Sequence, residues 1–336
     1  MLKISIYGIG NFGYAFLKHL DNKKMKDVQL AAYDRNLHLM NNLRENRSHI
    51  HFHKNVKLSN RIDFVKNEDS LIKDADIVIL AVSSSATREV LVKISPYLKD
   101  SVVILNTAKA LDYKTGMRLS EVVEETLSKH KYTYSLVAGG TIANDLFKHE
   151  PLGVDLACPD IKTLGQLTTL ISSNTLSVYP TTDLIGVEYA SSFKNIVSIF
   201  AGMIKGFGFS YGSETHMISR LAKSLGSVLV LDYGAQPETF GIGSQCWGND
   251  LWMSCTGNTR NREFGILLGK GLAVNEAIKV MEDEHKNVEG INTIKTLDKL
   301  KKLKKIPEIS LLYELIVTKT ITADKLKQHL LTNTVN

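Results

Sequence analysis

Lys194 lies in a stretch of otherwise apolar and small residues, GVEYASSFKNIVSIFAGMIKG, which runs from residue 186 to 206. Helical spacing puts six apolar side chains on one packing face: Phe193, Ile196, Val197, Phe200, Ala201 and Ile204. Ser191, Asn195 and Ser198 share a separate polar patch with Lys194. Burying a lysine is costly, and a desolvated lysine is suited to proton transfer. We therefore expect a catalytic lysine, with a snorkelling or paired structural lysine as the alternative.

A second polar concentration runs from Gly248 to Gly265 and reads GNDLWMSCTGNTRNREFG. Its polar members are Asp250, Ser254, Thr256, Asn258, Arg260, Asn261 and Arg262. Arginine with amide and hydroxyl neighbours suits a phosphate or a carboxylate. The segment is therefore expected to bind an anionic group, and a polar loop with surface arginines is the alternative.

Three glycines near the amino end have the spacing of a dinucleotide-binding loop. Gly8, Gly10 and Gly13 follow an apolar run over residues 4–7 and precede a helical pattern. Gly8 permits a tight turn, Gly10 lets the backbone approach a pyrophosphate, and Gly13 lets the helix pack close to the strand. The helix N-terminus would offer its free N–H groups to the phosphates. The alternative is a glycine-rich turn without a ligand.

Asp34 ends the second expected strand, about 20 residues beyond the third glycine, where NAD enzymes place a ribose-binding carboxylate. Its neighbour Arg35 suits a 2′-phosphate instead. The pair favours NAD and leaves NADP possible.

Lys109 follows another expected strand, residues 102–105, and is well placed for a ligand at the carboxyl edge of a parallel sheet. A surface lysine is the alternative. The stretch AGGTIAND, residues 138–145, follows the next strand with small residues that permit close approach.

Two clusters of charged or titratable residues are expected to carry no function. Three histidines at residues 49–53 suggest a metal, but they have no carboxylate cluster nearby, so a solvated connection is favoured and no metal is expected. Five lysines between residues 299 and 305 alternate with leucines, which predicts the solvated face of an amphipathic helix. Because that run contains no aromatic residues, no nucleic-acid partner is expected.

Strands and helices alternate along the first part of the chain and position these groups. Strands are expected at residues 4–7, 28–33, 76–82, 102–105, 134–137, 154–158 and 176–179. From residue 183 onward only helices are expected, one of them over residues 288–303. The pattern predicts an α/β fold, a Rossmann-type, doubly wound and mostly parallel sheet followed by an all-helical C-terminal domain. We place a dinucleotide-binding domain at residues 1–182 and a helical substrate-binding domain at residues 183–336.

The composition describes an ordinary soluble protein, with 336 residues, 43% hydrophobic and 23% charged. No apolar run of about 18 residues exists, so no membrane span is expected. The first strand leaves no room for a signal peptide. Three scattered cysteines, Cys158, Cys246 and Cys255, favour a reducing, cytoplasmic location over a disulfide frame or a zinc site. The modest net charge of +6 would also draw in an anionic substrate.

Five motifs in order resemble the NAD(P)-dependent sn-glycerol-3-phosphate dehydrogenase family over nearly the whole chain. They are GIGNFG from residue 8, LAVSSSATREVL from residue 80, NTAKAL from residue 106, GVEYASSFKNI from residue 186 and NDLWMSCTGNTRNREFG from residue 249. VEG at residues 288–290 resembles a further segment on the cofactor side. The resemblance implies reversible hydride transfer between NAD(P)H and dihydroxyacetone phosphate.

The resemblance also implies roles for particular residues. It places the catalytic lysines at Lys194 and Lys109, with Asp250 to position Lys194 and set its charge. Substrate binding falls to Asn195, Ser254, Arg260 and Asn261, the last two on the phosphate. Cofactor binding falls to Gly8, Gly10, Asn11, Phe12, Gly13, Asp34, Lys109, Ala143, Arg260 and Glu289. A small phosphorylated substrate is the expected partner, and a homodimer is possible.

The chain departs from the family pattern in three places. Residues 138–143 keep only Gly139, Ile142 and Ala143 of the usual segment, and Thr141 stands where serine or asparagine is usual. The Lys109 motif reads AKA, and Ser254 replaces a threonine. A related dehydrogenase acting on another phosphorylated ketone or a hydroxyacid therefore remains an alternative, as does, less favoured, a non-catalytic nucleotide-binding regulator.

Overall fold

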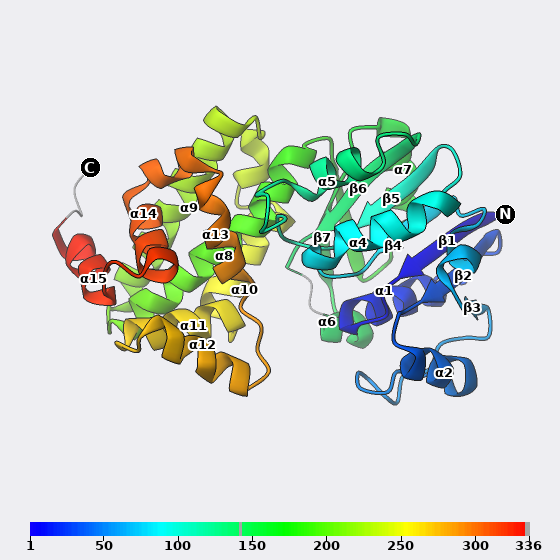
Figure 1. Cartoon of the computed structure of the whole chain (residues 1–336), viewed down its shortest axis with the longest axis horizontal. Coiled ribbons are helices and arrows are strands. Elements are labelled where there is room, and N and C mark those ends of the chain that lie inside the picture. The colour runs from blue at the N-terminus through cyan, green and yellow to red at the C-terminus, as the bar shows by residue number, and fades with distance from the viewer. Residues whose placement is uncertain (141–142, 333–336) are drawn as a thin grey trace. The chain divides into compact units, whose positions relative to one another are not determined.

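The structure is a computed structural model that describes residues 1–140 and 143–332. The chain divides into two compact units (Figure 1). The first unit contains residues 1–109 and 119–184, and the second contains residues 110–118 and 185–336. Arg118 belongs with the second unit, where its guanidinium lies 3.3 Å from the Glu188 carboxylate.

The first unit is built on one eight-stranded sheet with the order β3-β2-β1-β4-β5-β6-β7-β8. Every strand pair is parallel except β6 with β7, which is antiparallel. The strands are β1 (Leu2–Tyr7), β2 (Val28–Tyr33), β3 (Ile62–Phe64), β4 (Ile77–Leu80), β5 (Val102–Asn106), β6 (Tyr132–Ala138), β7 (Leu152–Ala157) and β8 (Leu176–Thr181). The strand order reverses beside β1, and ligands of doubly wound sheets bind at such a point.

Seven α-helices accompany this sheet among the described residues. They are α1 (Asn11–Asn22), α2 (Leu37–Asn46), α3 (Glu68–Ile72), α4 (Ser84–Ile94), α5 (Leu119–Thr126), α6 (Ala143–Lys148) and α7 (Ile161–Ile171). The central strands are continuous apolar runs because they are covered on both faces, and all four residues of β4 are buried. Pro180 is tolerated in β8 because β8 is an edge strand.

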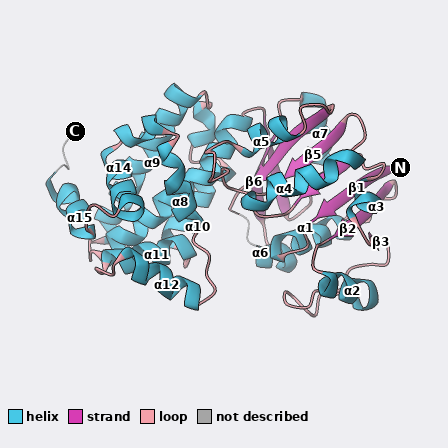
Figure 2. Ribbon diagram, in the orientation of Figure 1, coloured by secondary structure: helices cyan, strands magenta, loops and turns pink. Residues whose placement is uncertain are grey.

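The second unit contains helices and no strand among its described residues (Figure 2). Its α-helices are α8 (Leu184–Gly206), α9 (Tyr211–Tyr233), α10 (Asp250–Thr256), α11 (Arg260–Gly269), α12 (Val274–Asp283), α13 (Glu289–Lys295), α14 (Pro307–Tyr313) and α15 (Ala323–Thr332). The predicted fold class, a Rossmann-type domain followed by a helical domain, is confirmed. Among the described residues, no helix has both the length and the apolar character needed to cross a membrane.

Helix α8 is the core of this unit, and every residue from Gly186 to Ile204 is buried. Glycines bring α11 into close contact with α8. A Cβ atom on Gly202 would lie 2.0 Å from the Arg262 carbonyl oxygen, and one on Gly265 would lie 2.0 Å from the Ile199 carbonyl oxygen. This close approach fixes the N-terminus of α11 beside the middle of α8.

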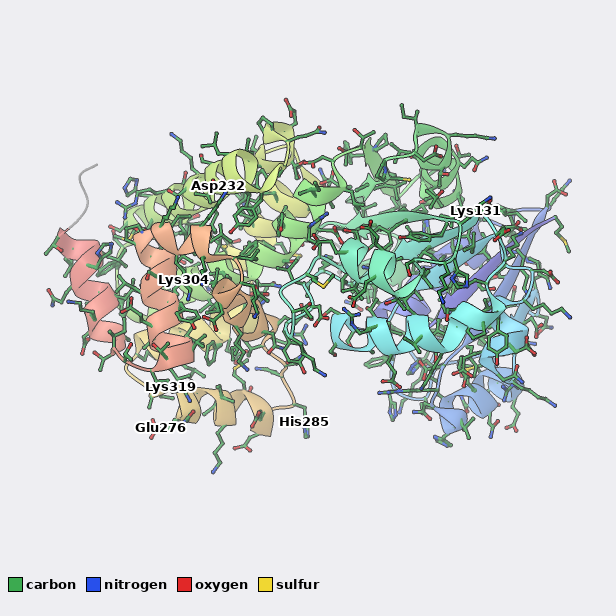
Figure 3. All side chains as sticks on the ribbon, turned by 45° about the horizontal axis from the view of Figure 1, so that its top comes forward. Lys131, Asp232, Glu276, His285, Lys304 and Lys319 are labelled. Atoms are coloured by element: carbon green, nitrogen blue, oxygen red, sulfur yellow. The ribbon has the colours of Figure 1, made fainter. Side chains whose placement is uncertain are left out.

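Several local predictions were wrong. The helix expected over residues 288–303 ends at Lys295, and Lys301–Lys305 forms a 3₁₀ helix, η5. Leu297, Leu300 and Leu303 are buried at a spacing of three, which suits the 3₁₀ period. Lys304, labelled in Figure 3, lies 3.1 Å from the Asp298 carboxylate. The basic face is therefore partly paired.

Two further differences concern the polar segments. Asp250–Thr256 forms α10 and Arg260–Gly269 forms α11, so the polar-loop alternative for that segment is wrong. The histidine segment is not uniformly solvated, because His49 is buried and only 3% exposed. β3 and α2 were not expected from the sequence.

Candidate active site

The glycine loop between β1 and α1 has the shape that its sequence requires. Gly8 has φ +98°, and a Cβ atom there would lie 2.6 Å from the Ala81 carbonyl oxygen. A Cβ atom on Gly13 would lie 2.1 Å from the Gly8 carbonyl oxygen. Side chains are therefore excluded at both positions by backbone atoms.

Gly10 differs from the other two glycines, because a Cβ atom there would meet nothing within 4 Å in the described part of the chain. Gly10 is the N-cap of α1, and no side chain among the described residues caps it. The next amides, those of Asn11, Phe12 and Gly13, therefore lie at a helix N-terminus with open space beside it. These features fit the pyrophosphate of a dinucleotide.

The Ile9 peptide is held on both sides. Its N–H donates to Asp34 Oδ2 at 2.8 Å, and its carbonyl oxygen lies 2.9 Å from His49 Nε2. Because a carbonyl can only accept, Nε2 carries the proton, and His49 Nδ1 accepts from the amides of His51 and Phe52. Burial lowers the pKa of His49, and these contacts suit the neutral ring. From the sequence, His49 was expected only to lie in a solvated connection.

Asp34 occupies the position expected of a ribose-binding residue, at the end of β2, but it also has a structural task. Besides accepting from Ile9, its Oδ1 accepts from the Asn36 amide at 2.9 Å. Each carboxylate oxygen therefore has one backbone donor and retains further acceptor capacity.

Lys109 follows β5, and its half-buried ammonium donates to the Gly139 carbonyl oxygen. Ala143 is the first residue of α6 and is buried. Thr141, where the family pattern is altered, and Ile142, where it is kept, lie outside the described residues.

In the second unit, Lys194 on α8 meets two side chains of α10. Its Nζ lies 2.8 Å from Asp250 Oδ1 and 3.1 Å from Ser254 Oγ. Ser254 Oγ in turn lies 3.2 Å from Asp250 Oδ1. Asp250 is 0% exposed and Lys194 is 8% exposed, so the pair is almost fully withdrawn from water. The structure thus brings together three side chains that the family resemblance places in one site, and their joint action stays a prediction.

The next residue on α8 joins a different set of contacts. Asn195 Oδ1 accepts from Asn261 Nδ2 at 2.9 Å, and Asn261 Oδ1 accepts from the Gly290 amide at 2.9 Å. Asn195 is 1% exposed, and its Nδ2 has no hydrogen-bond partner among the residues that the structure describes. Sequence reasoning did not assign a role to Gly290.

The two arginines of α11 have different surroundings. Arg262 pairs with Glu214 at 2.7 Å, and both side chains are largely buried. Arg260 is 54% exposed, and its guanidinium lies 3.9 Å from the Glu289 carboxylate. Arg260 is therefore the more accessible cation of the two, and Glu214 is the charge partner that the sequence did not reveal.

The described residues contain no group of three or more histidine, cysteine, aspartate or glutamate side chains that could hold a metal ion. Each unit thus offers a distinct set of groups. The first has open backbone amides and a lysine. The second has a buried lysine–aspartate pair, a chain of amides and an exposed arginine.

Two family profiles together match most of the chain. The profile of the NAD-dependent glycerol-3-phosphate dehydrogenase N-terminus matches residues 3–164, and that of the C-terminus matches residues 183–326. The chain belongs to the NAD-dependent glycerol-3-phosphate dehydrogenase family. The resemblance inferred from the motifs is thereby confirmed.

Individual sequence relatives bear the name of the same family. The chain is 30% identical over 302 residues to a glycerol-3-phosphate dehydrogenase [NAD(P)+] of Syntrophomonas wolfei, covering 88% of this chain and 84% of the relative. It is 29% identical over 295 residues to the Clostridium tetani protein of the same name, covering 86% and 80%.

Solved structures show the same fold. A glycerol-3-phosphate dehydrogenase of Coxiella burnetii superimposes with a TM-score of 0.84 at 23% identity, covering 99% of each chain. The Plasmodium falciparum glycerol-3-phosphate dehydrogenase gives a TM-score of 0.88 at 17% identity, covering 100% of this chain and 96% of that one.

Proposed function

We propose that this protein interconverts dihydroxyacetone phosphate and sn-glycerol 3-phosphate, with NAD(P)H as the hydride donor and a proton taken up in reduction. The observation that carries the proposal is the buried Lys194–Asp250 pair in a chain of this dehydrogenase family. When bound, the nicotinamide cofactor supplies or accepts the hydride.

Lys194 is the proposed proton donor. Reduction of a ketone places negative charge on its oxygen, and a nearby ammonium both stabilises that charge and supplies the proton. Asp250 favours the ammonium and fixes Nζ through a 2.8 Å contact, while Ser254 holds Nζ from a second direction. In the reverse direction Lys194 takes the proton from the alcohol.

The remaining site residues have proposed binding roles. Lys109 polarises or orients the carbonyl, and Asn195 contributes a donor to the substrate. Arg260 and Asn261 bind the phosphate, and the exposure of Arg260 supports its role. Binding energy from the phosphate would then orient the reacting carbon, which lies elsewhere on the substrate.

The cofactor is proposed to bind at the glycine loop, with Gly8, Gly10, Asn11, Phe12 and Gly13 at its pyrophosphate. Lys109, Ala143, Arg260 and Glu289 would supply further cofactor contacts. The open space at Gly10 and the uncapped N-terminus of α1 support the pyrophosphate position.

Asp34 is proposed to bind the ribose hydroxyls and to favour NADH, with Arg35 as its competitor for NADPH. Asp34→Ala should narrow the preference for NADH over NADPH in kcat/KM. Asp34→Asn is the matched control, because its single side-chain oxygen can still accept from one of the two backbone amides that contact Asp34, those of Ile9 and Asn36. A strong native preference for NADPH would show that Arg35 or a nearby residue dominates.

The substrate is tested by following NADH and NADPH oxidation with dihydroxyacetone phosphate. Turnover at millimolar substrate is expected, and its absence with both cofactors would contradict the proposal. Other phosphorylated ketones and hydroxyacids serve as comparisons, because the Gly139–Ala143 segment departs from the family. A clearly higher kcat/KM with one of them would reassign the substrate.

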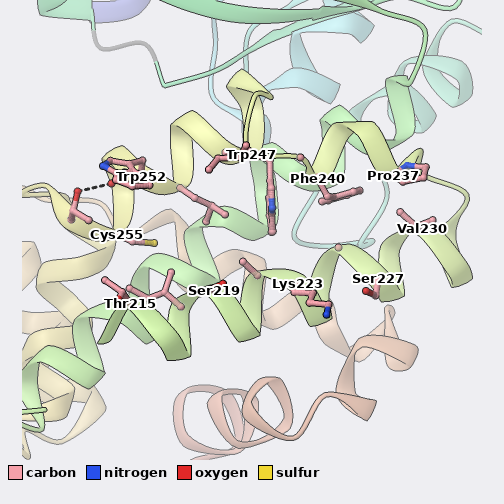
Figure 4. Close-up of a pocket in the computed structure, with 18 of the residues that line it drawn as sticks. Thr215, Ser219, Lys223, Ser227, Val230, Pro237, Phe240, Trp247, Trp252 and Cys255 are labelled. Atoms are coloured by element: carbon pink, nitrogen blue, oxygen red, sulfur yellow. Dashed lines mark hydrogen bonds between the residues drawn. The ribbon is translucent and has the colours of Figure 1, made fainter. Parts of the chain in front are cut away.

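We also propose a homodimer that uses an apolar groove in the second unit. The groove has a volume of about 810 Å³, with α9 along one wall and residues 237–256 along the other (Figure 4). Leu231, Ile242 and Trp252 line it and are 83%, 85% and 68% exposed. Large exposed apolar patches mark interaction sites. Light scattering of the wild type and of Trp252→Glu tests this, and a monomeric wild type would contradict it.

A cytoplasmic location is likewise a proposal. Cys158, Cys246 and Cys255 are free and buried, which suits a reducing compartment. Fractionation of source cells would test it, and recovery of the protein outside the cytoplasm would contradict it.

A further inference from the structure

The chain of amides from Gly290 to Asn195 has a fixed direction. A backbone N–H can only donate, so the atom of Asn261 that meets the Gly290 amide must be an oxygen. The other end of Asn261 is then its NH₂ group, which must meet an oxygen of Asn195. Side-chain amide orientations are usually ambiguous, but one backbone donor settles both of these.

This direction decides what Asn195 presents at its free end. Its Oδ1 is taken by Asn261, so the group that remains is Nδ2, a pure donor. That nitrogen is buried and has no partner among the described residues. Buried polar groups are nearly always hydrogen-bonded, so this donor calls for an acceptor outside the described residues, a water or a ligand.

Helix capping alone does not account for the chain of contacts. Gly290 is the second residue of α13, and the first amides of a helix lack intrahelical partners. Any side-chain oxygen could cap that amide, so a cap does not need the NH₂ group of Asn261. Gly290 also permits the close approach, since a Cβ atom would lie 2.9 Å from Asn261 Oδ1 and 2.6 Å from Ile199 Cδ1.

We propose that the Gly290 amide and Asn261 turn Asn195 so that its Nδ2 donates to an acceptor oxygen of the phosphorylated substrate; for Asn261 this positioning is in addition to the phosphate contact proposed above. The substrate identity rests on the proposed function, whereas the direction of the amide chain does not. Asn195 would touch the substrate, and the Gly290 amide would act through Asn261.

The sharpest variant is Asn261→Asp. A carboxylate still accepts from the Gly290 amide, so the cap survives, but its second oxygen cannot donate. Asn195 must then rotate its NH₂ group toward Asp and present an acceptor to the substrate. We expect KM for dihydroxyacetone phosphate to rise about tenfold to a hundredfold, with kcat within about threefold and thermal stability retained.

An uncharged variant separates the effect of the amide direction on KM from the effect of charge repulsion between Asp and the substrate phosphate. Gly290→Ala displaces Asn261 without adding a charge, and it should raise the same KM by a smaller factor. Gly165→Ala on α7 is the matched control, because a Cβ atom there meets nothing within 4 Å among the described residues. A KM within twofold of wild type for Asn261→Asp, or a Gly290→Ala that changes only thermal stability, would overturn the proposal.

Side-chain amide NMR with ¹⁵N-asparagine gives a readout that needs no turnover. The Asn195 signal, assigned by its loss in Asn195→Ala, should move when inorganic phosphate or dihydroxyacetone phosphate is added without cofactor. In Asn261→Asp it should be displaced before either is added. If phosphate moves the signal but no dihydroxyacetone phosphate is reduced, the proposed function fails and the positioning stands. Normal turnover with an unmoved signal would overturn the positioning.

Discussion

The glycine loop and the Lys194 cluster, which consists of Lys194, Asp250 and Ser254, present different kinds of atoms at their surfaces. At the loop, backbone atoms form the surface, and side chains are excluded at Gly8 and Gly13 by contacts under 3 Å. At the cluster, side chains form the surface, and the Lys194–Asp250 pair lies in a helical core. The loop is therefore sensitive to added atoms, and the cluster is sensitive to unbalanced charge.

The largest effect should come from removing the buried cation. Lys194→Met should lower kcat/KM by at least about a hundredfold, which is typical for loss of general acid catalysis. It should also destabilise the fold by about 3–5 kcal/mol, because Asp250 is left as an unpaired buried carboxylate. Steady-state kinetics and denaturant unfolding measure the two effects separately.

Two further variants complete this test of the cluster. Asp250→Asn combined with Lys194→Met should restore much of the stability but none of the turnover, since it removes the unpaired charge without replacing the proton donor. Lys205→Met, on the exposed side of the same helix, should change neither quantity appreciably. Near-normal turnover of Lys194→Met would remove Lys194 from the catalytic role.

The second prediction compares two glycines of the loop. Gly13→Ala should destabilise the protein by about 1–3 kcal/mol or more, because its Cβ overlaps the Gly8 carbonyl. Gly10→Ala should leave unfolding almost unchanged and weaken NADH binding about tenfold, since its Cβ would fill space meant for the pyrophosphate. Denaturant unfolding and NADH titration distinguish them, and equal NADH affinity of Gly10→Ala and wild type would contradict the pyrophosphate position.

This contrast explains which parts of the fold the sequence could predict. β2 was predicted with its observed bounds, residues 28–33, because its last four residues form a buried apolar run. β3 has only three residues, too few to form a recognisable pattern. The helix expected across residues 288–303 was wrong because leucines three apart fit both a helical face and a 3₁₀ turn, and only packing chose between them.

Prediction of the candidate site was limited in the same way, because local sequence patterns do not reveal contacts between residues far apart in the chain. Glycine spacing alone predicted the loop, because backbone geometry restricts residue type at those positions. The Lys194 cluster needed family motifs, since Asp250 is 56 residues away in sequence and no local pattern joins the two. His49 was given no role from the sequence because it acts through a backbone contact with Ile9, 40 residues away, which no spacing rule describes.

His49 provides the smallest predicted effect and links the loop to side-chain chemistry. Burial lowers the pKa of His49, and the neutral ring donates from Nε2 to the Ile9 carbonyl oxygen. As pH falls below about 6.5, the ordinary histidine value, the unfolded chain takes up a proton that the folded ring resists. Stability from His49 is therefore present above that pH and lost as the pH falls toward the lowered pKa.

His49→Gln isolates this contribution, because the amide can donate to Ile9 and accept from the following amides without titrating. The variant should be within about 1 kcal/mol of wild type at neutral pH and should lose less stability than wild type between about pH 7.5 and pH 5.5. His19, whose pKa is also lowered by burial, is present in both proteins, so its contribution cancels in the difference. Parallel stability curves would show that His49 does not titrate with folding. NADH affinity is measured over the same pH range. If wild type and His49→Gln differ in the pH dependence of NADH affinity as they do in that of stability, the neutral His49 ring keeps the glycine loop in the conformation that binds NADH.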